Sequence, residues 1–299
     1  MSGITARRRA GAAFAALALA GVVAGCGGDD DDAASSETIR LAVTDVQGLE
    51  ELQREFGAFK DTFEELTDTE LEFFAVADRA AAATALDADR VDVVFTGPAE
   101  YVVMRARTDA EPIVAIRRPD YHSCIYTTVD SGITTVDELA GTTIAMSDVG
   151  STSGHLGPSQ LLVDAGFDPQ EDMEILTVGD AVHEALVRGD VDAVGIGCHD
   201  YAEFMESDDP ANYTMLVEGD PLPPDVLIAR DGFDEDTVEL VRTTFVDHFG
   251  ELLESMLEGA DNAKYENAEI VEVDDSDYDV VRSMYEAVGV DDFTEFVGD

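Results

Sequence analysis

The chain has 299 residues, of which 45% are apolar, so it is long enough for a sizeable core and two lobes. Its 66 acidic residues outnumber its 17 basic ones, which gives a formal net charge of −49. Such a chain offers no basic surface that could displace counterions from nucleic acid, so nucleic-acid binding is excluded. Because the acids run through regular apolar patterning rather than forming one tail, their excess indicates a halophilic protein adapted to high salt.

The first 25 residues have the pattern of a signal peptide. Arg7, Arg8 and Arg9 precede an apolar run over residues 10–24, which is too short for an ordinary membrane span. The run ends in VVAGC at Cys26, which resembles the lipobox of secreted lipoproteins and predicts lipidation at that cysteine. Residues 26–37 hold four consecutive aspartates among small residues, which indicates a disordered acidic tether. An uncleaved membrane anchor is the alternative, and both place the folded part outside the cell.

From residue 38 the chain alternates strands and helices, which predicts an α/β fold with mainly parallel sheets flanked by helices. In the first lobe we expect strands at residues 39–43, 70–76, 91–95, 112–117 and 123–129, and helices at 49–66, 79–87 and 99–107. In the second lobe we expect strands at residues 142–146, 173–178 and 191–196, and helices at 156–165 and 181–188. After a return at residues 213–217, we expect a strand at 225–229 and helices at 234–257 and 278–288. Residues 38–128 and 218–299 are therefore assigned to lobe 1 and residues 129–217 to lobe 2, with a cleft between them.

Residues 147–160 read SDVGSTSGHLGPSQ and place Ser151, Thr152 and Ser153 between a strand and a helix. The N–H groups of a first helical turn have no intrahelical acceptor, and the positive end of the helix dipole lies behind them. With three hydroxyls added, this turn is suited to an oxyanion. We call residues 151–154 the oxyanion seat. An ordinary N-cap is the structural alternative.

Three stretches together give the chain a family resemblance. They are VDVVFTGPAEYV (residues 91–102), SGITTVDELAGTTIAMSDVGSTSGHLGP (131–158) and AVHEALVRGDVDAVGIG (181–197). In this order they resemble the substrate-binding lipoproteins of phosphonate, phosphite and phosphate ABC importers, which have the two-lobe type II periplasmic-binding-protein fold. The resemblance implies capture of an oxyanion in the interlobe cleft and delivery to a permease driven by an ATPase. It implies a lipid-anchored protein on the extracytoplasmic face of the membrane, with no cofactor and no enzymatic activity.

The resemblance also implies roles for individual residues. Ser151, Thr152, Ser153 and Gly154 would hold the oxyanion, and Tyr101 matches a tyrosine of the opposite wall, although a core position is its alternative. His155 stands where the family usually has tyrosine, and a surface or cap position is its alternative. The family's histidine before the helix at 181–188 is missing, as is the aromatic residue after the first strand, at residues 45–48.

Three further candidates follow the strand at residues 191–196. His199, Asp200 and Tyr201 should emerge at the carboxyl end of the sheet, where α/β ligand sites lie, unless they merely begin the next helix. An acidic residue there would suit a ligand that bears an amine. Because arginines are few, we expect the helix dipole and neutral donors to provide recognition. Hinges are expected near Cys124 and near residues 223–229.

Cys124 and Cys198 remain once Cys26 is assigned to lipid, and they are either bridged or two buried free thiols. Two other classes of function compete with solute binding. A secreted hydrolase is disfavoured because Thr152, not serine, stands at the centre of the Gly150–Gly154 pattern. A metal-capturing lipoprotein would use side chains whose spacing matches no established zinc pattern: His122, Cys124, His155, His183, Cys198 and His199.

Overall fold

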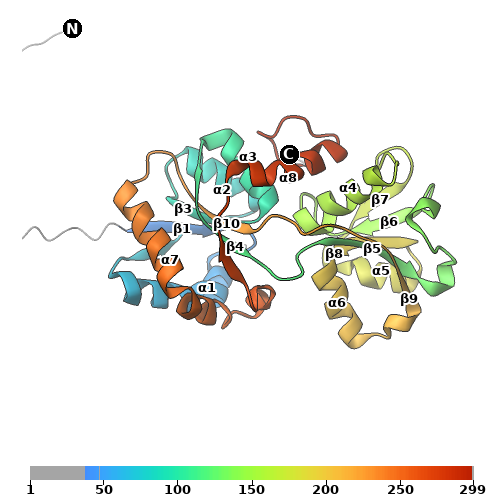
Figure 1. The fold of residues 1–299 in the computed structure, drawn as a ribbon, viewed down its shortest axis with the longest axis horizontal. Helices are drawn as coiled ribbons and strands as arrows, with labels where there is room; N and C mark the ends of the chain where they lie inside the picture. Colours follow the sequence, from blue (N-terminus) through green and yellow to red (C-terminus); the bar gives the residue numbers. More distant parts are fainter. Residues whose placement is uncertain (1–37, 47, 298–299) are drawn as a thin grey trace, which may run out of the picture. The chain divides into compact units, whose positions relative to one another are not determined.

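The computed structural model describes residues 38–46 and 48–297. The predicted signal peptide, Cys26 and the acidic tether lie outside these residues. The described residues belong to one compact unit, in which they build two sheets (Figure 1). Within the described ranges, every helix is too short or too polar to cross a membrane.

The first sheet, within the described residues, has six strands in the order β11-β4-β10-β3-β1-β2. These strands are β1 (Ile39–Val43), β2 (Leu71–Phe73), β3 (Val93–Thr96), β4 (Glu111–Arg117), β10 (Asp225–Ala229) and β11 (Glu269–Val271). Helices α1 (Leu49–Thr67) and α7 (Glu235–Met256) pack on one face. Helices α2 (Arg79–Asp87), α3 (Pro98–Thr108) and α8 (Asp279–Ala287) pack on the other face.

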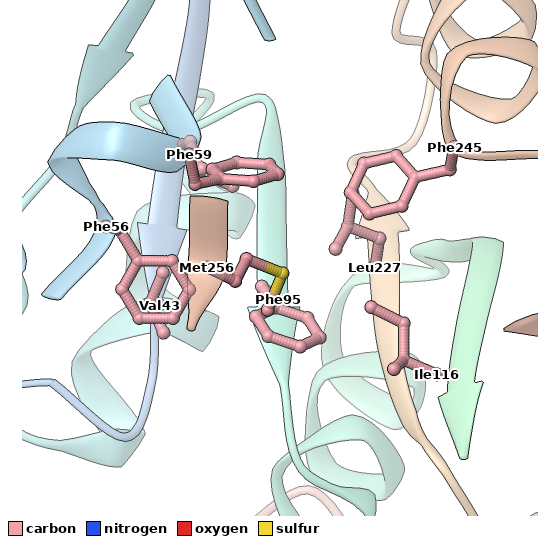
Figure 2. Close-up of a pocket in the computed structure, with 9 residues that line it drawn as sticks. Val43, Phe56, Phe59, Phe95, Ile116, Leu227, Phe245 and Met256 are labelled. Carbon is pink, nitrogen blue, oxygen red and sulfur yellow. The ribbon is translucent and has the colours of Figure 1, made fainter. Parts of the chain in front are cut away.

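Apolar side chains at helical spacing explain why α1 lies flat on this sheet. Leu52, Phe56, Phe59 and Phe63 recur every three or four residues and are all buried, as an amphipathic helix requires. Figure 2 shows two of these phenylalanines facing Phe245 of α7 across a small cavity. All side chains that line this cavity are apolar, so it belongs to the core and offers no polar ligand a partner.

The second sheet, in the same part of the chain, has five strands in the order β7-β6-β8-β5-β9. These strands are β5 (Ser123–Thr128), β6 (Thr143–Met146), β7 (Glu174–Thr177), β8 (Ala193–Gly197) and β9 (Tyr213–Glu218). Helix α4 (Gly157–Asp164) packs on one face, and α5 (Val182–Arg188) and α6 (Cys198–Ser207) pack on the other.

Both sheets are mixed: most strands of each sheet run in one direction, as expected, but each sheet also contains antiparallel pairs. Strand β1 pairs in parallel with β2 and β3, but β10 runs antiparallel to both of its neighbours, β3 and β4. In the second sheet, β5 likewise runs antiparallel to β8 and β9. Strands β5 and β10 are those by which the chain enters one sheet from the other. They are therefore not built from the βαβ units that make strands parallel.

Two segments connect the sheets, residues 118–122 and residues 219–224. Because β5 belongs to the second sheet, the first crossover precedes the boundary expected at residue 128. The two segments lie side by side, since the Leu222 N–H donates to the Tyr121 carbonyl (2.9 Å) and the Gly219 N–H donates to the Ser123 carbonyl (2.8 Å). A disulfide between Cys124 and Cys198 ties β5 to the first residue of α6.

Helix α8 is shared between the two halves of the fold. It contacts α3, which covers the first sheet, and also α4 and the turn η3 (Thr152–Leu156), which belong to the second. Val280 and Met284 of α8 line a groove together with Leu161 of α4 and Leu222 of the second crossing segment. The C-terminal helix therefore connects the lobes a third time.

Candidate binding site

The oxyanion seat lies at the start of a helix, as the sequence predicts. Thr152–Leu156 form the π-helical turn η3, which runs directly into α4. Ser151 is the N-cap, and its hydroxyl accepts a hydrogen bond from the Gly154 N–H (3.2 Å). The N–H groups of Thr152 and Ser153 also belong to this first turn, where no intrahelical acceptor exists. Ser151 therefore acts as an N-cap, which was the alternative to oxyanion binding. The N–H groups of Thr152 and Ser153 lie beside it as hydrogen-bond donors.

Gly154 fixes the turn against the end of β6. A side chain there would bring its Cβ to 2.5 Å from the Cβ of Ser147, so only glycine fits. The Gly154 carbonyl also accepts a hydrogen bond from the Ser147 N–H (2.9 Å). The glycine therefore shapes the seat through its backbone.

Thr152 connects the seat to the first lobe. Its hydroxyl accepts a hydrogen bond from the N–H of Ala99, in the first turn of α3 (3.1 Å). Thr152 also interacts with the side chain of Tyr121, whose pKa burial raises. The beginnings of α3 and η3 therefore face each other, and the positive ends of both helix dipoles meet there.

Basic side chains of the first lobe gather at this junction. Lys264 Nζ lies 2.8 Å from Asp45 Oδ2, and Arg79 Nη1 lies 3.4 Å from Asp45 Oδ1. Arg79 Nη1 also donates to Oε1 of Glu100 (2.6 Å). Burial alone would raise the pKa of Asp45, but Lys264 and Arg79 lower it on balance. Asp45 is therefore an ionised carboxylate held between two cations.

Arg118 adds a third cation at the start of the first crossing segment. Its Nη2 donates to Oδ1 of Asp225 (3.1 Å), and its guanidinium lies 3.6 Å from the ring centroid of Tyr121. The Tyr265 hydroxyl donates to Oδ2 of the same aspartate (2.7 Å). Burial alone would lower the pKa of Arg118, but Asp225 raises it on balance, so the guanidinium stays charged. We call Arg79, Arg118 and Lys264 the cation cluster.

His199 and Asp200 approach this cluster from the first turn of α6 in the second lobe. The His199 ring meets Tyr121 edge to face at 6.1 Å. Burial, together with Arg118 and Lys264, lowers the pKa of His199 to about 4. Burial raises the pKa of Asp200 to about 6, although Arg118 opposes this rise. At neutral pH an uncharged imidazole and a carboxylate therefore face the cations.

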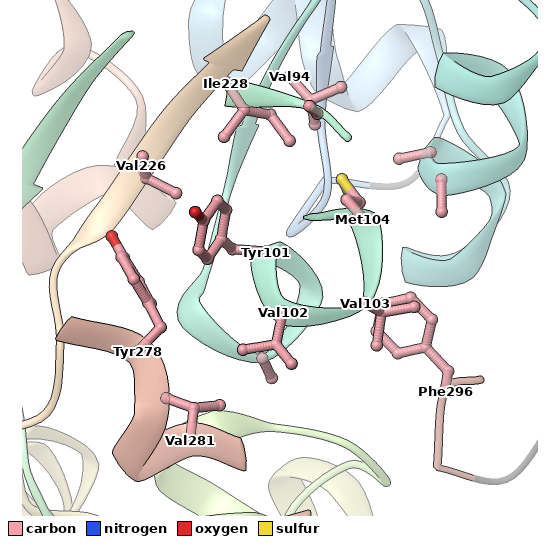
Figure 3. Close-up of a cluster of buried hydrophobic side chains, with 14 of the residues drawn as sticks. Val94, Tyr101, Val102, Val103, Met104, Val226, Ile228, Tyr278, Val281 and Phe296 are labelled. Carbon is pink, nitrogen blue, oxygen red and sulfur yellow. The ribbon is translucent and has the colours of Figure 1, made fainter. Parts of the chain in front are cut away.

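Two other candidates from the sequence lie away from the seat. The Tyr101 side chain is fully buried, its hydroxyl donates to Asp275 (3.0 Å), and its ring lies 4.3 Å from that of Tyr278 (Figure 3). Tyr201 packs against Tyr126 inside the second lobe, with ring centroids 4.8 Å apart. The structure brings neither tyrosine together with the seat, and Tyr101 takes the core position named as its alternative.

His155 turns back onto the loop that precedes the seat. Its Nδ1 accepts a hydrogen bond from the Gly150 N–H (3.2 Å), and the side chain is buried. Burial lowers the pKa of His155 from 6.5 to about 4. Between these values the unfolded chain binds a proton that the folded chain does not, so acid favours unfolding. Stability should fall by about 1.4 kcal/mol for each pH unit below 6.5 until the folded pKa is reached.

Replacing His155 with asparagine tests this pH dependence. The side-chain oxygen of the asparagine keeps an acceptor for the Gly150 N–H, and the amide does not titrate. Denaturant unfolding at several values of pH between 4.5 and 7 should show the stability gap between wild type and His155→Asn narrowing as the pH falls. A gap that stays constant over this range would contradict the assignment.

The cation cluster was not predicted from the sequence. Neutral donors were expected because basic residues are few, whereas Arg79, Arg118 and Lys264 converge from distant parts of the chain on Asp45. One signal was present, because Lys264 is one of only two lysines in the sequence. Because lysine is so rare in this acidic chain, the position of a lysine is a stronger indication of a functional site here than in an ordinary protein.

The side chains named for metal capture do not converge. Cys124 and Cys198 are joined to each other, and His183 stacks on Phe204 with ring centroids 4.7 Å apart. Across residues 38–46 and 48–297, no group of three or more His, Cys, Asp or Glu side chains is placed to hold a metal ion. The metal-capture alternative therefore has no site in this part of the chain.

Two α/β sheets joined by crossing segments, with a polar site at their junction, define a two-lobed solute-binding protein. A family model described as ABC transporter, phosphonate, periplasmic substrate-binding protein matches residues 41–278. The chain therefore belongs to the periplasmic substrate-binding proteins of phosphonate ABC transporters, as the three sequence stretches predict. Its fold class and its role as a transporter's substrate-binding protein follow from this membership.

Individual relatives agree with this assignment. The phosphate-import protein PhnD of Mycolicibacterium smegmatis is 27% identical over 309 residues, covering 93% of this chain and 95% of that protein. A binding protein component of an ABC phosphonate transporter from Pseudomonas aeruginosa superimposes with a TM-score of 0.63 at 16% identity, covering 84% of this chain and 86% of that one. PhnD1 of Prochlorococcus marinus, in complex with methylphosphonate, gives a TM-score of 0.62 at 17% identity, covering 85% and 99%. At these identities the two solved structures support the fold alone.

Proposed function

We propose that this protein captures a phosphonate, phosphite or phosphate ion at the oxyanion seat. The observation that carries this proposal is the position of Thr152, in the open first turn of η3, directly opposite the start of α3. Two helix N-termini and the neighbouring cation cluster supply positive potential there, although the chain as a whole is strongly negative. Lobe closure would then deliver the ion to the permease and its ATPase.

The charges around the seat favour an oxyanion without an amine. Asp45, Glu100 and Asp225 each have a basic partner, namely Lys264, Arg79 and Arg118. An ammonium group on the ligand would have to compete with these cations for a carboxylate. Small ions such as phosphate, phosphite and methylphosphonate avoid that competition. This proposal replaces the suggestion, made from Asp200 alone, that the site would suit an amine.

The preferred ion can be found by titration calorimetry in molar salt. Methylphosphonate, 2-aminoethylphosphonate, phosphite, phosphate and sulfate should be compared, with zinc as the test of metal capture. We expect one oxyanion to bind best and the aminated phosphonate to bind less well than methylphosphonate. Binding of zinc without any oxyanion would overturn the proposal, and tighter binding of the aminated ligand would overturn the charge argument.

Thr152→Val tests the junction between the lobes. The valine has nearly the same shape but loses the hydroxyl that accepts from the Ala99 N–H. Because a hydrogen bond of this kind contributes about 1 kcal/mol, we expect the dissociation constant of the preferred oxyanion to rise about fivefold. Thr152→Ser keeps the hydroxyl and serves as the matched control. An unchanged dissociation constant for Thr152→Val would remove this residue from the site.

A capture role requires no covalent step, so we infer that the protein is not an enzyme. Steady hydrolysis of a phosphate ester that is lost in Ser151→Ala or Ser153→Ala would contradict this inference. We also infer that the mature protein is anchored by lipid at Cys26 on the extracytoplasmic face of the membrane, with the first 25 residues removed as a signal peptide. Mass spectrometry of the N-terminal peptide tests this, because Cys26→Ala should abolish lipidation and release the protein.

We further infer that the protein works in high salt. Besides the excess of acids, α1 and α3 end at aspartates in the left-handed conformation, Asp68 (φ 55°) and Asp109 (φ 53°). Glycine or asparagine is usual at such positions, and a negative charge at a helix C-terminus is unfavourable unless salt screens it. Both Asp68→Asn and Asp109→Asn should therefore stabilise the protein more in dilute buffer than in molar salt.

A further inference from the structure

We propose that Glu100 is the proton-linked group of the binding site. When Glu100 is protonated, the positive charge of Arg79 is available to attract the oxyanion. When Glu100 is ionised, its carboxylate forms an ion pair with Arg79 instead. This inference rests on the proposed capture of an oxyanion at the seat. It adds a specificity-determining residue that makes affinity depend on pH.

The position of Glu100 is unusual for a charged side chain. The residue is fully buried in the first turn of α3, and its Oε1 accepts the hydrogen bond from Arg79. Its Oε2 is buried and has no hydrogen-bond partner among the described residues. A Cβ on Gly97 would lie 2.8 Å from this oxygen, so the glycine at the N-cap of α3 leaves room for it. Burying an ionised carboxylate oxygen that has no hydrogen-bond partner costs free energy, and burying a protonated carboxyl costs less.

The groups that face Glu100 come from several elements. Asp45, after β1, shares Arg79 with it and is itself held by Lys264. Asp225, at the start of β10, lies on the same side of Gly97, with its Oδ1 3.8 Å from where a Cβ on that glycine would be, and it is bound by Arg118 and Tyr265. Burial and the nearby Asp45 raise the pKa of Glu100, although Arg79 opposes this rise. The surroundings therefore favour the neutral form.

Counting charges shows why this proton matters. With Asp45, Glu100 and Asp225 all ionised, every member of the cation cluster is already neutralised, and Asp200 and Asp148 add further negative charge, so an incoming anion finds no net positive charge. A proton on Glu100 makes the site one charge more positive. That charge lies on Arg79, which is close enough to Asp148, before the seat, for the two to interact. Arg79 is thus placed between Glu100 and the seat.

The direction of the pH dependence follows from linkage. An oxyanion binds better to the protonated form, so its binding raises the pKa of Glu100 and draws in a proton. The dissociation constant of the wild type should rise by up to about tenfold for each pH unit above the pKa of Glu100 in the free protein. Below that pKa the dependence should vanish.

Glu100→Gln tests the inference, because glutamine mimics the protonated carboxyl. The dissociation constant of inorganic phosphate should be measured for wild type and variant between pH 5 and pH 9 in molar salt. The ratio of the two constants cancels the titration of phosphate itself. We expect the constants to agree at low pH and the wild type to bind progressively more weakly than Glu100→Gln as the pH rises. A ratio that does not change with pH would overturn the inference.

Glu55→Gln is the matched control, because Glu55 of α1 is likewise a buried glutamate paired with an arginine but is not part of the binding site. The control should keep the pH dependence of the wild type, and if it loses the dependence while Glu100→Gln retains it, Glu100 is not the linked group. If Glu100→Gln does not fold, the wild type can be used instead. Calorimetric titration with phosphate in buffers of different ionisation enthalpy then measures how many protons are taken up on binding. Proton uptake beyond that of phosphate supports the inference, and its absence refutes it. If the wild type binds no oxyanion at any pH, the proposed function fails instead.

Discussion

Replacing Ser153 with aspartate should abolish oxyanion binding, weakening it by at least about 100-fold. Ser153 is buried in the first turn of η3, next to Thr152. A carboxylate there would occupy the seat and repel an anionic ligand, and like charges brought together in this way cost several kcal/mol. Each 1.4 kcal/mol corresponds to about a factor of ten in the dissociation constant. Titration calorimetry with the preferred oxyanion measures the loss.

Ser153→Asn is the matched control, since asparagine has the same shape as aspartate without its charge. It should weaken binding much less than Ser153→Asp. Aspartate is favoured near a helix N-terminus, so Ser153→Asp should melt at or above the temperature of Ser153→Asn. Equal losses of affinity in the two variants would mean that size, not charge, decides binding at this position.

Arg118→Ala should lower the free energy of unfolding by about 3–5 kcal/mol. The substitution leaves the carboxylate of Asp225 buried without its cation, and it also removes the guanidinium from the face of Tyr121. An unpaired buried charge is among the most costly defects a folded protein can carry. Denaturant unfolding at neutral pH gives the value.

Two comparisons make this prediction specific. Arg188, with 59% of its side chain exposed, pairs with Asp190 at the surface, and Arg188→Ala should change stability by less than about 0.5 kcal/mol. The double variant Arg118→Met/Asp225→Leu removes both charges and should recover most of the loss. If Arg118→Ala costs no more than Arg188→Ala, the ion pair with Asp225 does not support the fold.

Much of the fold could be predicted because its signals are local. The bounds of β1 and α2 match the prediction, and α1 differs by one residue, because apolar periodicity and nearby capping residues define these elements. The place of β10, inserted antiparallel between β3 and β4, could not be predicted because it depends on contacts between distant strands. The three-residue strand β11 is too short to leave a periodic signal.

The candidate site likewise has one part that could be predicted from the sequence and one part that could not. The seat is a single stretch of sequence, so its strand, turn and helix could be read together. The cation cluster combines residues 79, 118 and 264, and no local pattern links them. Tyr101 matched a family motif, but a motif fixes the position along α3 and not the direction of the side chain. Its burial against Tyr278 follows from the packing of the C-terminal segment on α3, which the sequence does not reveal.

The shared helix α8 has a consequence for motion. If only the two crossing segments connected the lobes, the cleft could open by a simple hinge rotation about those segments. Here α8 also touches α3 on one lobe and α4 and η3 on the other. Opening must therefore slide α8 along α4 or part the two helices, which makes it a shear as well as a hinge motion. Because η3 carries the seat, this contact with α8 lies beside the proposed position of the ligand.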